Sequence, residues 1–159
     1  MVFECSRIGF PKNTGGPMSI YQTLVNKASD ARTQAQADLN ELRLVAANLR
    51  NELEGAIHAP EGCIQLAQTK PDGLLRPVAP TNLAYTEKNT IEFSFRVQLE
   101  GARSTVATLS VPASVSRTDV GIVVIVEGSN PSVYAGASNP LTIKLIENSL
   151  VQQANEVGV

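Results

Sequence analysis

Apolar residues in the first third of the chain recur at intervals of three and four positions, which is the spacing of one face of an α-helix. No glycine or proline interrupts residues 19–54. Ser19 is a favourable N-cap, and Gly55 followed by Pro60 favours a helix end. The pattern therefore predicts one long amphipathic helix over residues 19–57.

The apolar stripe of this helix follows a heptad repeat with one stutter at Ala35. A helix of this length rises about 55 Å, whereas a compact chain of this size has a radius of gyration of only about 15 Å. We therefore expect a bundle between subunits; the alternative is a helix that lies on the chain's own sheet. The predicted interface consists of Leu24, Ala28, Ala31, Ala35, Leu39, Leu42, Ala46, Leu49 and Leu53.

Residues 90–100 alternate between apolar and polar side chains, with Phe93, Phe95 and Val97 on the apolar face. A period of two over this length predicts a long strand with one buried face. A short turn at 101–103 and a second strand at 104–111 complete a predicted hairpin.

Two further strands are expected later in the chain. Residues 120–127 are apolar on both faces, which is typical of a central strand that is covered on both sides. Residues 141–147 alternate and predict a last strand. The tail at 151–159 is expected to fray, and the alternative is a short helical turn at 148–154. Pro112 is expected to end the strand at 104–111.

The sequence thus predicts an α+β fold, with a long N-terminal helix followed by a mostly antiparallel sheet or sandwich. A small hairpin is predicted where the turn residues at 70–73 join strands at 64–69 and 74–78. The expected organisation is a flexible arm at 1–18, the helix at 19–57, a Pro- and Gly-containing linker at 58–89, a β domain at 90–150 and a tail at 151–159.

Composition narrows the function classes. The chain has 159 residues, 43% of them hydrophobic, and a formal net charge of −2, so general binding to nucleic acid or to an anionic membrane is not expected. Neither a secretory signal nor a membrane-spanning apolar run is recognisable, which predicts a soluble protein in the cytoplasm, or in a virion if it is viral. The alternative to a flexible N-terminal arm is that Met18 is the natural start of the protein. Cys5 and Cys63 are expected to be free thiols, and the alternative is that they pair with each other.

Catalytic chemistry has few candidates. His58 is the single histidine, and with Glu61 and Cys63 it offers only a weak loop cluster for a metal. The alternative for His58 is a helix C-terminal residue whose charge suits the helix dipole. Glu92 and Glu100 share one strand face but lie about 26 Å apart, too far to cooperate. We expect no catalytic residue, cofactor or metal site, and therefore no enzyme.

Two residues remain as candidates for binding. Arg96 lies on the polar face of the long strand, where it can meet an anion or an acidic partner, or pair with a glutamate on the neighbouring strand. Tyr134 lies in a long loop at 128–140, which is either functional or a solvated hairpin tip.

The expected function is that of a non-enzymatic structural protein that self-associates through its N-terminal helix, such as a viral or phage structural component. The alternative is a small module that binds a ligand or a protein partner on its β domain.

Overall fold

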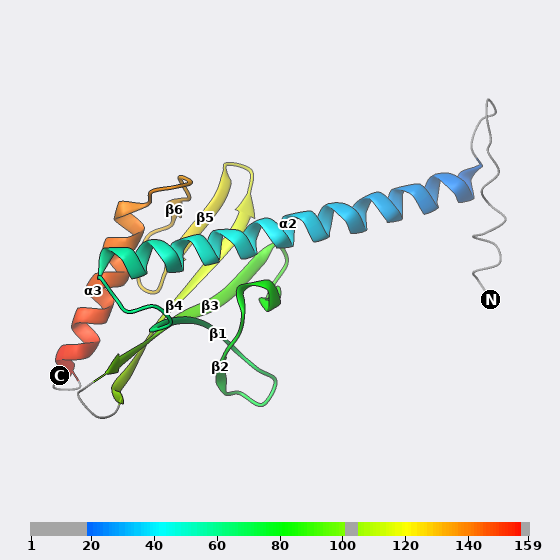
Figure 1. Cartoon of the computed structure of the whole chain (residues 1–159). Coiled ribbons are helices and arrows are strands. Elements are labelled where there is room, and N and C mark those ends of the chain that lie inside the picture. Colours follow the sequence, from blue (N-terminus) through cyan, green and yellow to red (C-terminus); the bar gives the residue numbers. More distant parts are fainter. Residues whose placement is uncertain (1–18, 101–104, 157–159) are drawn as a thin grey trace. The chain divides into compact units, whose positions relative to one another are not determined.

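The computed structural model describes residues 19–100 and 105–156 (Figure 1). Two compact units divide the chain, Met1–Ala37 and Asp38–Val159. The elements in chain order are α2 (Ile20–Ala56), β1 (Ile64–Thr69), β2 (Leu75–Pro77), the 3-10 turn η1 (Pro80–Asn82), β3 (Thr90–Glu100), β4 (Thr105–Thr118), β5 (Gly121–Val126), β6 (Ser132–Val133) and α3 (Pro140–Glu156). The predicted arm at 1–18, including Cys5 and the alternative start at Met18, lies outside the described residues, as do the turn at 101–103 and residues 157–159.

Helix α2 begins and ends close to the predicted positions. The hydroxyl of Ser19 accepts a hydrogen bond from the amide of Gln22 at 3.0 Å and so caps the helix. The helix continues through Gly55, and His58 then adopts a positive φ of 56°. The amide of Ala59 donates to the carbonyl of Glu54 at 3.0 Å, which closes the last turn as in a Schellman motif.

The six strands form one antiparallel sheet in the order β2-β1-β3-β4-β5-β6. The predicted α+β class is confirmed, and so is the small hairpin of β1 with β2, which pairs Gln68 with Arg76. Both strands come from residues 58–89, so this predicted linker contributes to the sheet. The predicted strand at 90–100 is confirmed as β3.

The prediction that Pro112 ends its strand is wrong, because β4 runs through it to Thr118. Pro112 has no amide hydrogen to donate, but it lies where none is needed: β5 pairs with β4 only from Ala113 onward. The carbonyl of Pro112 still accepts from the amide of Glu127 at 3.0 Å. Farther along the same edge, the side chain of Gln153 bonds the amide and carbonyl of Ser110 at 3.2 and 2.7 Å.

The prediction that β5 is covered on both faces is also wrong. Val124 and Val126 are buried on the inner face, but Ile125 on the outer face is 37% exposed. β5 has only the two-residue β6 as its outer neighbour. A continuous apolar run therefore does not by itself identify a strand with two covered faces.

The predicted last strand at 141–147 is instead the first half of α3, and the expected short helical turn at 148–154 belongs to the same helix. The buried side chains Ile143, Ile146 and Leu150 recur at helical spacing, which a short window of alternation conceals. Pro140 opens the helix, where its missing amide hydrogen is harmless.

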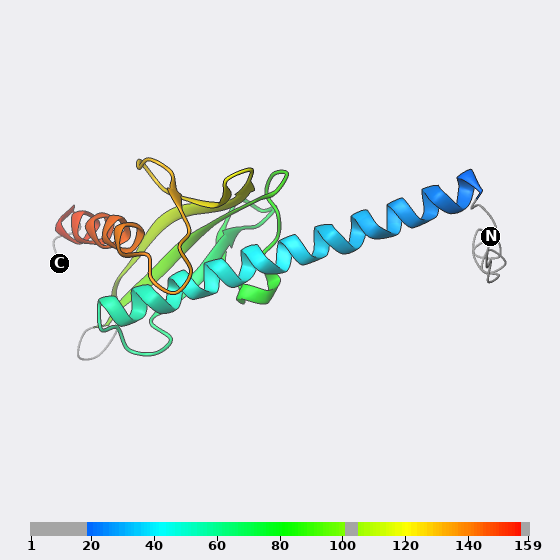
Figure 2. The ribbon, with the colours of Figure 1, turned by 90° about the horizontal axis from the view of Figure 1, so that it is seen from above.

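The core lies between one face of the sheet and the two helices of the unit Asp38–Val159. Seen from above, residues 38–56 of α2 run along one face of the sheet, and α3 lies at one end of it (Figure 2). The inward residues of β3 and β4 pack there, with the Phe93 and Phe95 rings edge to face at a centroid distance of 5.1 Å. No described helix covers the other face of the sheet, which carries polar side chains such as Glu92 and Thr108.

Candidate functional site

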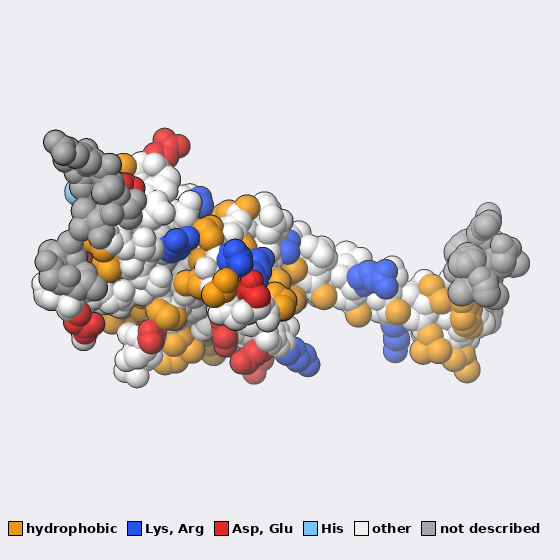
Figure 3. Space-filling model, turned by 90° about the horizontal axis from the view of Figure 1, so that it is seen from below, with side chains coloured by type: hydrophobic (Ala, Val, Ile, Leu, Met, Phe, Trp, Pro, Cys, Tyr) orange, Lys and Arg blue, Asp and Glu red, His pale blue; other side chains and the backbone are white. Residues whose placement is uncertain are grey.

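The part of α2 that belongs to the unit Met1–Ala37 exposes an apolar face. Hydrophobic side chains gather at the N-terminal end of the helix (Figure 3). Four large apolar side chains are exposed there: Ile20 (80%), Tyr21 (54%), Leu24 (59%) and Val25 (38%). Ala28, Ala31 and Ala35 of the predicted interface are exposed as well. From one helical turn to the next these positions repeat at intervals of three or four residues, so they share one broad helix face.

The C-terminal part of the predicted interface is buried within the chain itself. Leu42, Ala46, Leu49 and Leu53 are all 0% exposed within a single chain, and Leu39 packs half-buried against the same core. Their assignment to an interface between chains is therefore corrected: they pack on the chain's own sheet. For these residues the alternative interpretation, a helix lying on its own sheet, is the right one.

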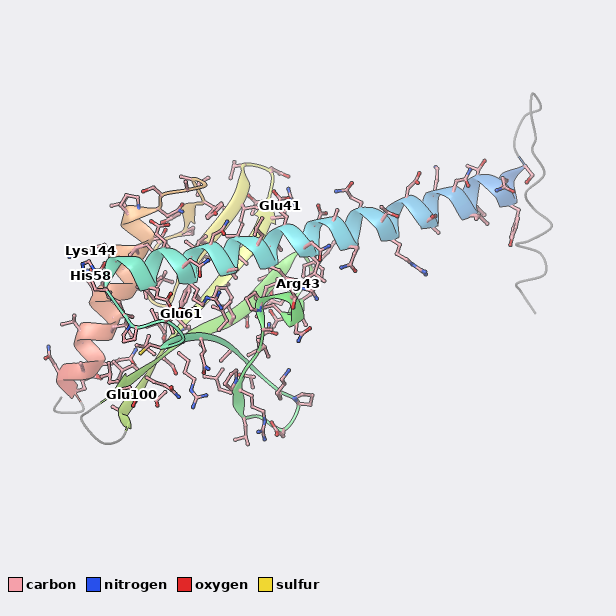
Figure 4. All side chains as sticks on the ribbon, viewed as in Figure 1. Glu41, Arg43, His58, Glu61, Glu100 and Lys144 are labelled. Carbon is pink, nitrogen blue, oxygen red and sulfur yellow. The ribbon has the colours of Figure 1, made fainter. Side chains whose placement is uncertain are left out.

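Polar contacts on both sides of this buried stripe hold α2 in place. Arg117 at the end of β4 forms ion pairs with Asp38, at 3.3 Å, and with Glu41. Arg43 donates from Nε to the carbonyl of Leu83 at 2.7 Å. Glu41 and Arg43 lie on opposite sides of the helix (Figure 4).

The tyrosine beside these contacts has a perturbed acidity. Burial, and then the carboxylate of Asp38, raises the pKa of Tyr85, while Arg43 acts in the opposite direction. The ion pairs of Arg117 and the hydrogen bond of Arg43 fix the rotation of α2 about its axis.

Tyr134 and its loop are tied to α2. The Nδ2 of Asn48 donates to the Tyr134 hydroxyl at 3.1 Å. Glu52 accepts from the amide of Asn139 at 2.7 Å and from its Nδ2 at 3.1 Å. Because Asn139 directly precedes α3, the Glu52 carboxylate lies at the positive end of that helix. The loop therefore docks two helices together and is not simply a solvated hairpin tip.

Arg96 lies on the opposite face of the sheet from Tyr134, so the structure does not bring the two candidate binding residues together. Its neighbours on the adjacent strands are Gln65 and Ser110. Within residues 19–100 and 105–156, no carboxylate pairs with Arg96, so the expected cross-strand glutamate is not found. Its role in binding stays a prediction.

Within the described residues, His58, Glu61 and Cys63 do not form a cluster of metal ligands. His58 is exposed and lies two residues after α2 ends at Ala56, which agrees with its alternative position at the helix C-terminus. The thiol of Cys63 is free and donates to the carbonyl of Gln98 at 2.8 Å. In the described part of the chain, no three His, Cys, Asp or Glu side chains gather as metal ligands would.

Sequence reasoning missed the contacts that position α2. Glu52 and Asn139 are 87 residues apart in the chain, and neither belongs to a recognisable motif. The only available signal was Asn139-Pro140, a typical helix start.

No described helix is long and apolar enough to span a bilayer. Comparison with protein-family models, with curated proteins and with solved structures finds no match.

Proposed function

We propose that this chain is an assembly protein whose copies associate through residues 20–37 of α2. The observation that carries the proposal is the exposed apolar face formed by Ile20, Tyr21, Leu24 and Val25. Contiguous exposed apolar surface of this kind marks interaction sites in proteins. The proposed interface comprises these four residues with Ala28, Ala31 and Ala35.

The chemistry of the segment favours a second copy of the same chain as the partner. Its charged side chains are Lys27, Asp30 and Arg32, so identical segments repel one another little and can form pairs between chains. Alanines along the face allow close approach of helices, and the larger residues at its N-terminal end supply buried area. Burial of Leu24, the one leucine of the segment, stabilises such a contact by roughly 1.5–3 kcal/mol.

Helix stability supplies a second argument. Residues 20–37 make about five turns of helix, and their large apolar side chains stay exposed in the described chain. Most helical stability in proteins comes from packing of the apolar face. A bundle of several copies provides that packing.

The test compares two leucines of equal exposure on the same helix. Leu24 and Leu44 are each 59% exposed. We expect the full chain to form a discrete oligomer in light scattering coupled to size exclusion. Leu24→Asp should reduce it to the monomer because a charge enters the apolar face, whereas Leu44→Asp should leave the oligomer unchanged.

Two results would contradict the proposal: a monomeric wild-type chain, or equal masses for the two variants. Substitution is sharper here than deletion of residues 1–59, because that deletion also removes Leu42, Leu49 and Leu53 from the core. Membership of the assembly in a virus particle stays a prediction.

The second candidate function is a ligand-binding module, as the sequence also predicts. It is supported by a cavity of about 450 Å³ on the outer face of the sheet.

A further inference from the structure

Large and small side chains are segregated along the exposed apolar face of residues 20–37. Ile20, Tyr21, Leu24 and Val25 lie in its first two turns, and every later position of the predicted interface in this segment is an alanine. All of these residues are exposed. The face is therefore bulky at one end of the segment and shallow at the other.

This segregation disfavours a parallel pair of identical segments. In a parallel pair each residue meets its own counterpart, so Leu24 packs on Leu24 of the partner subunit and alanine packs on alanine. The separation of two packed helices depends on the side chains between them. The bulky end would hold the helices apart and leave unfilled space at the alanine end, whereas protein contacts are close-packed.

Reversing one of the two helices places a large side chain against a small one at both ends of the contact. When Leu24 lies opposite Ala35 of the partner subunit, Ala28 lies opposite Ala31 of the partner subunit, since one chain advances as the other recedes. A two-fold axis repeats the leucine contact at the other end. Large residues that face small ones interdigitate, so the helices keep a nearly constant separation.

The charges beside the apolar stripe give an independent indication of the orientation. Lys27 directly precedes Ala28 and Arg32 directly follows Ala31, so the two cations flank the stripe on its two sides. Both are exposed, and in the part of the chain that the structure describes neither forms an ion pair. A parallel pair brings the two flanks together and places Lys27 beside Arg32 of the partner subunit, twice by symmetry. This opposition of like charges disfavours the parallel orientation.

In an antiparallel pair each flank of the stripe meets the same flank of the other copy. Lys27 then lies beside Gln34 of the partner subunit, and Arg32 lies beside Val25 of the partner subunit. No like charges are opposed in this arrangement. The methylene groups of Arg32 also cover Val25, which is 38% exposed in the single chain.

We propose that residues 20–37 associate as antiparallel pairs, in which Leu24 of each copy packs against Ala35 of the partner subunit. The orientation rests on the proposed self-association and adds to it which residues meet. Side-chain size and charge favour the same orientation, and each does so independently of the other.

Disulfide trapping tests the orientation. Two full-length variants are mixed, Leu24→Cys and Ala35→Cys, each of which also carries Cys5→Ser and Cys63→Ser. The mixture is equilibrated in a glutathione redox buffer, and the disulfide-linked products are measured by intact mass. Because two cysteines bridge only when their Cα atoms lie within about 7 Å, an antiparallel pair predicts about tenfold more mixed disulfide than either homodisulfide. Thr33→Cys on the opposite side of the helix is the control, and it should form no disulfide between chains.

The outcomes separate the orientation from the self-association itself. A chain that light scattering shows to be monomeric refutes both. If the chain is oligomeric, an excess of homodisulfides establishes parallel pairing and overturns the orientation alone. A random mixture of products, or no disulfide at all, overturns it as well.

The charge argument has a test without engineered cysteines. In a parallel pair Arg32→Glu converts two like-charge contacts with Lys27 into attractive ones, so association would tighten by about fivefold or more. The antiparallel pair predicts no tightening, because this position lies beside Val25 of the partner subunit. The concentration at which the oligomer dissociates distinguishes the two, and clear tightening would overturn the antiparallel orientation.

Discussion

The two parts of α2 have the same apolar spacing and opposite surroundings. In residues 38–56 the stripe is completely buried at Leu42, Leu49 and Leu53. In residues 20–37 the corresponding face is exposed at Leu24 and at the alanines that follow it. One continuous repeat thus includes core positions of a single chain and positions that no part of the described chain covers.

This difference shows what hydrophobic periodicity reports. Spacing of three and four residues defines a helix face, but it does not say whether a sheet or another copy of the chain covers that face. The composition of the stripe carries more information: leucine dominates it in the half that packs on the sheet, whereas from Ala28 to Ala35 of the other half it carries only alanine. The polar residues that flank the stripe matter as well, since Arg117 pairs with Asp38 and Glu41 of the buried half.

The largest change in the free energy of unfolding is expected when a buried leucine on the C-terminal half of the helix is replaced, compared with an exposed one. Leu49→Asp places a carboxylate at a position that is 0% exposed, so we expect it to lower the free energy of unfolding by about 4 kcal/mol or more. Leu44→Asp on the 59% exposed face should change it by less than about 0.5 kcal/mol. Urea denaturation followed by circular dichroism measures both, and similar midpoints would mean that the rotation of α2 is assigned wrongly.

The sheet side of the same core gives the next prediction. Phe95 is 0% exposed and contacts the ring of Phe93. Phe95→Ala is expected to cost about 3–5 kcal/mol, because it removes a large side chain from close-packed surroundings. A change below about 1 kcal/mol in the same denaturation experiment would contradict the burial of this face.

A smaller effect is expected where α2 meets α3. Glu52→Ala removes the acceptor of two Asn139 hydrogen bonds, and a loss of about 2 kcal/mol is expected. Glu54→Ala is the matched control, since it removes a carboxylate two positions along the helix for which no described partner exists. If thermal unfolding shifts equally for both variants, the Glu52 contact does not dock the helices.

Much of this fold was predictable where one periodicity dominated. Eleven alternating residues identified β3, and Ser19 with its breaker-free run identified α2. The segment at 141–147 is too short for alternation to exclude a helix, and its burial depends on β4 and β5, which lie elsewhere in the chain. The contacts that position the sites were not predictable, because pairs such as Arg43 with Leu83 or Gln68 with Glu92 arise only once distant segments meet.

The last prediction makes one chemical change in both halves of α2. Ala46 is 0% exposed, whereas Ala28 is exposed. Glycine in a helix interior costs about 1 kcal/mol relative to alanine, and Ala46→Gly also loses a buried methyl group worth about 0.8 kcal/mol. We therefore expect Ala46→Gly to lower the free energy of unfolding of the sheet unit by about 1–2 kcal/mol. Ala28→Gly should leave that free energy unchanged and instead weaken association, measured as the concentration at which the oligomer dissociates. Should Ala28→Gly destabilise the sheet unit as much as Ala46→Gly does, the two halves would fold as one, and the contrast between them would be lost.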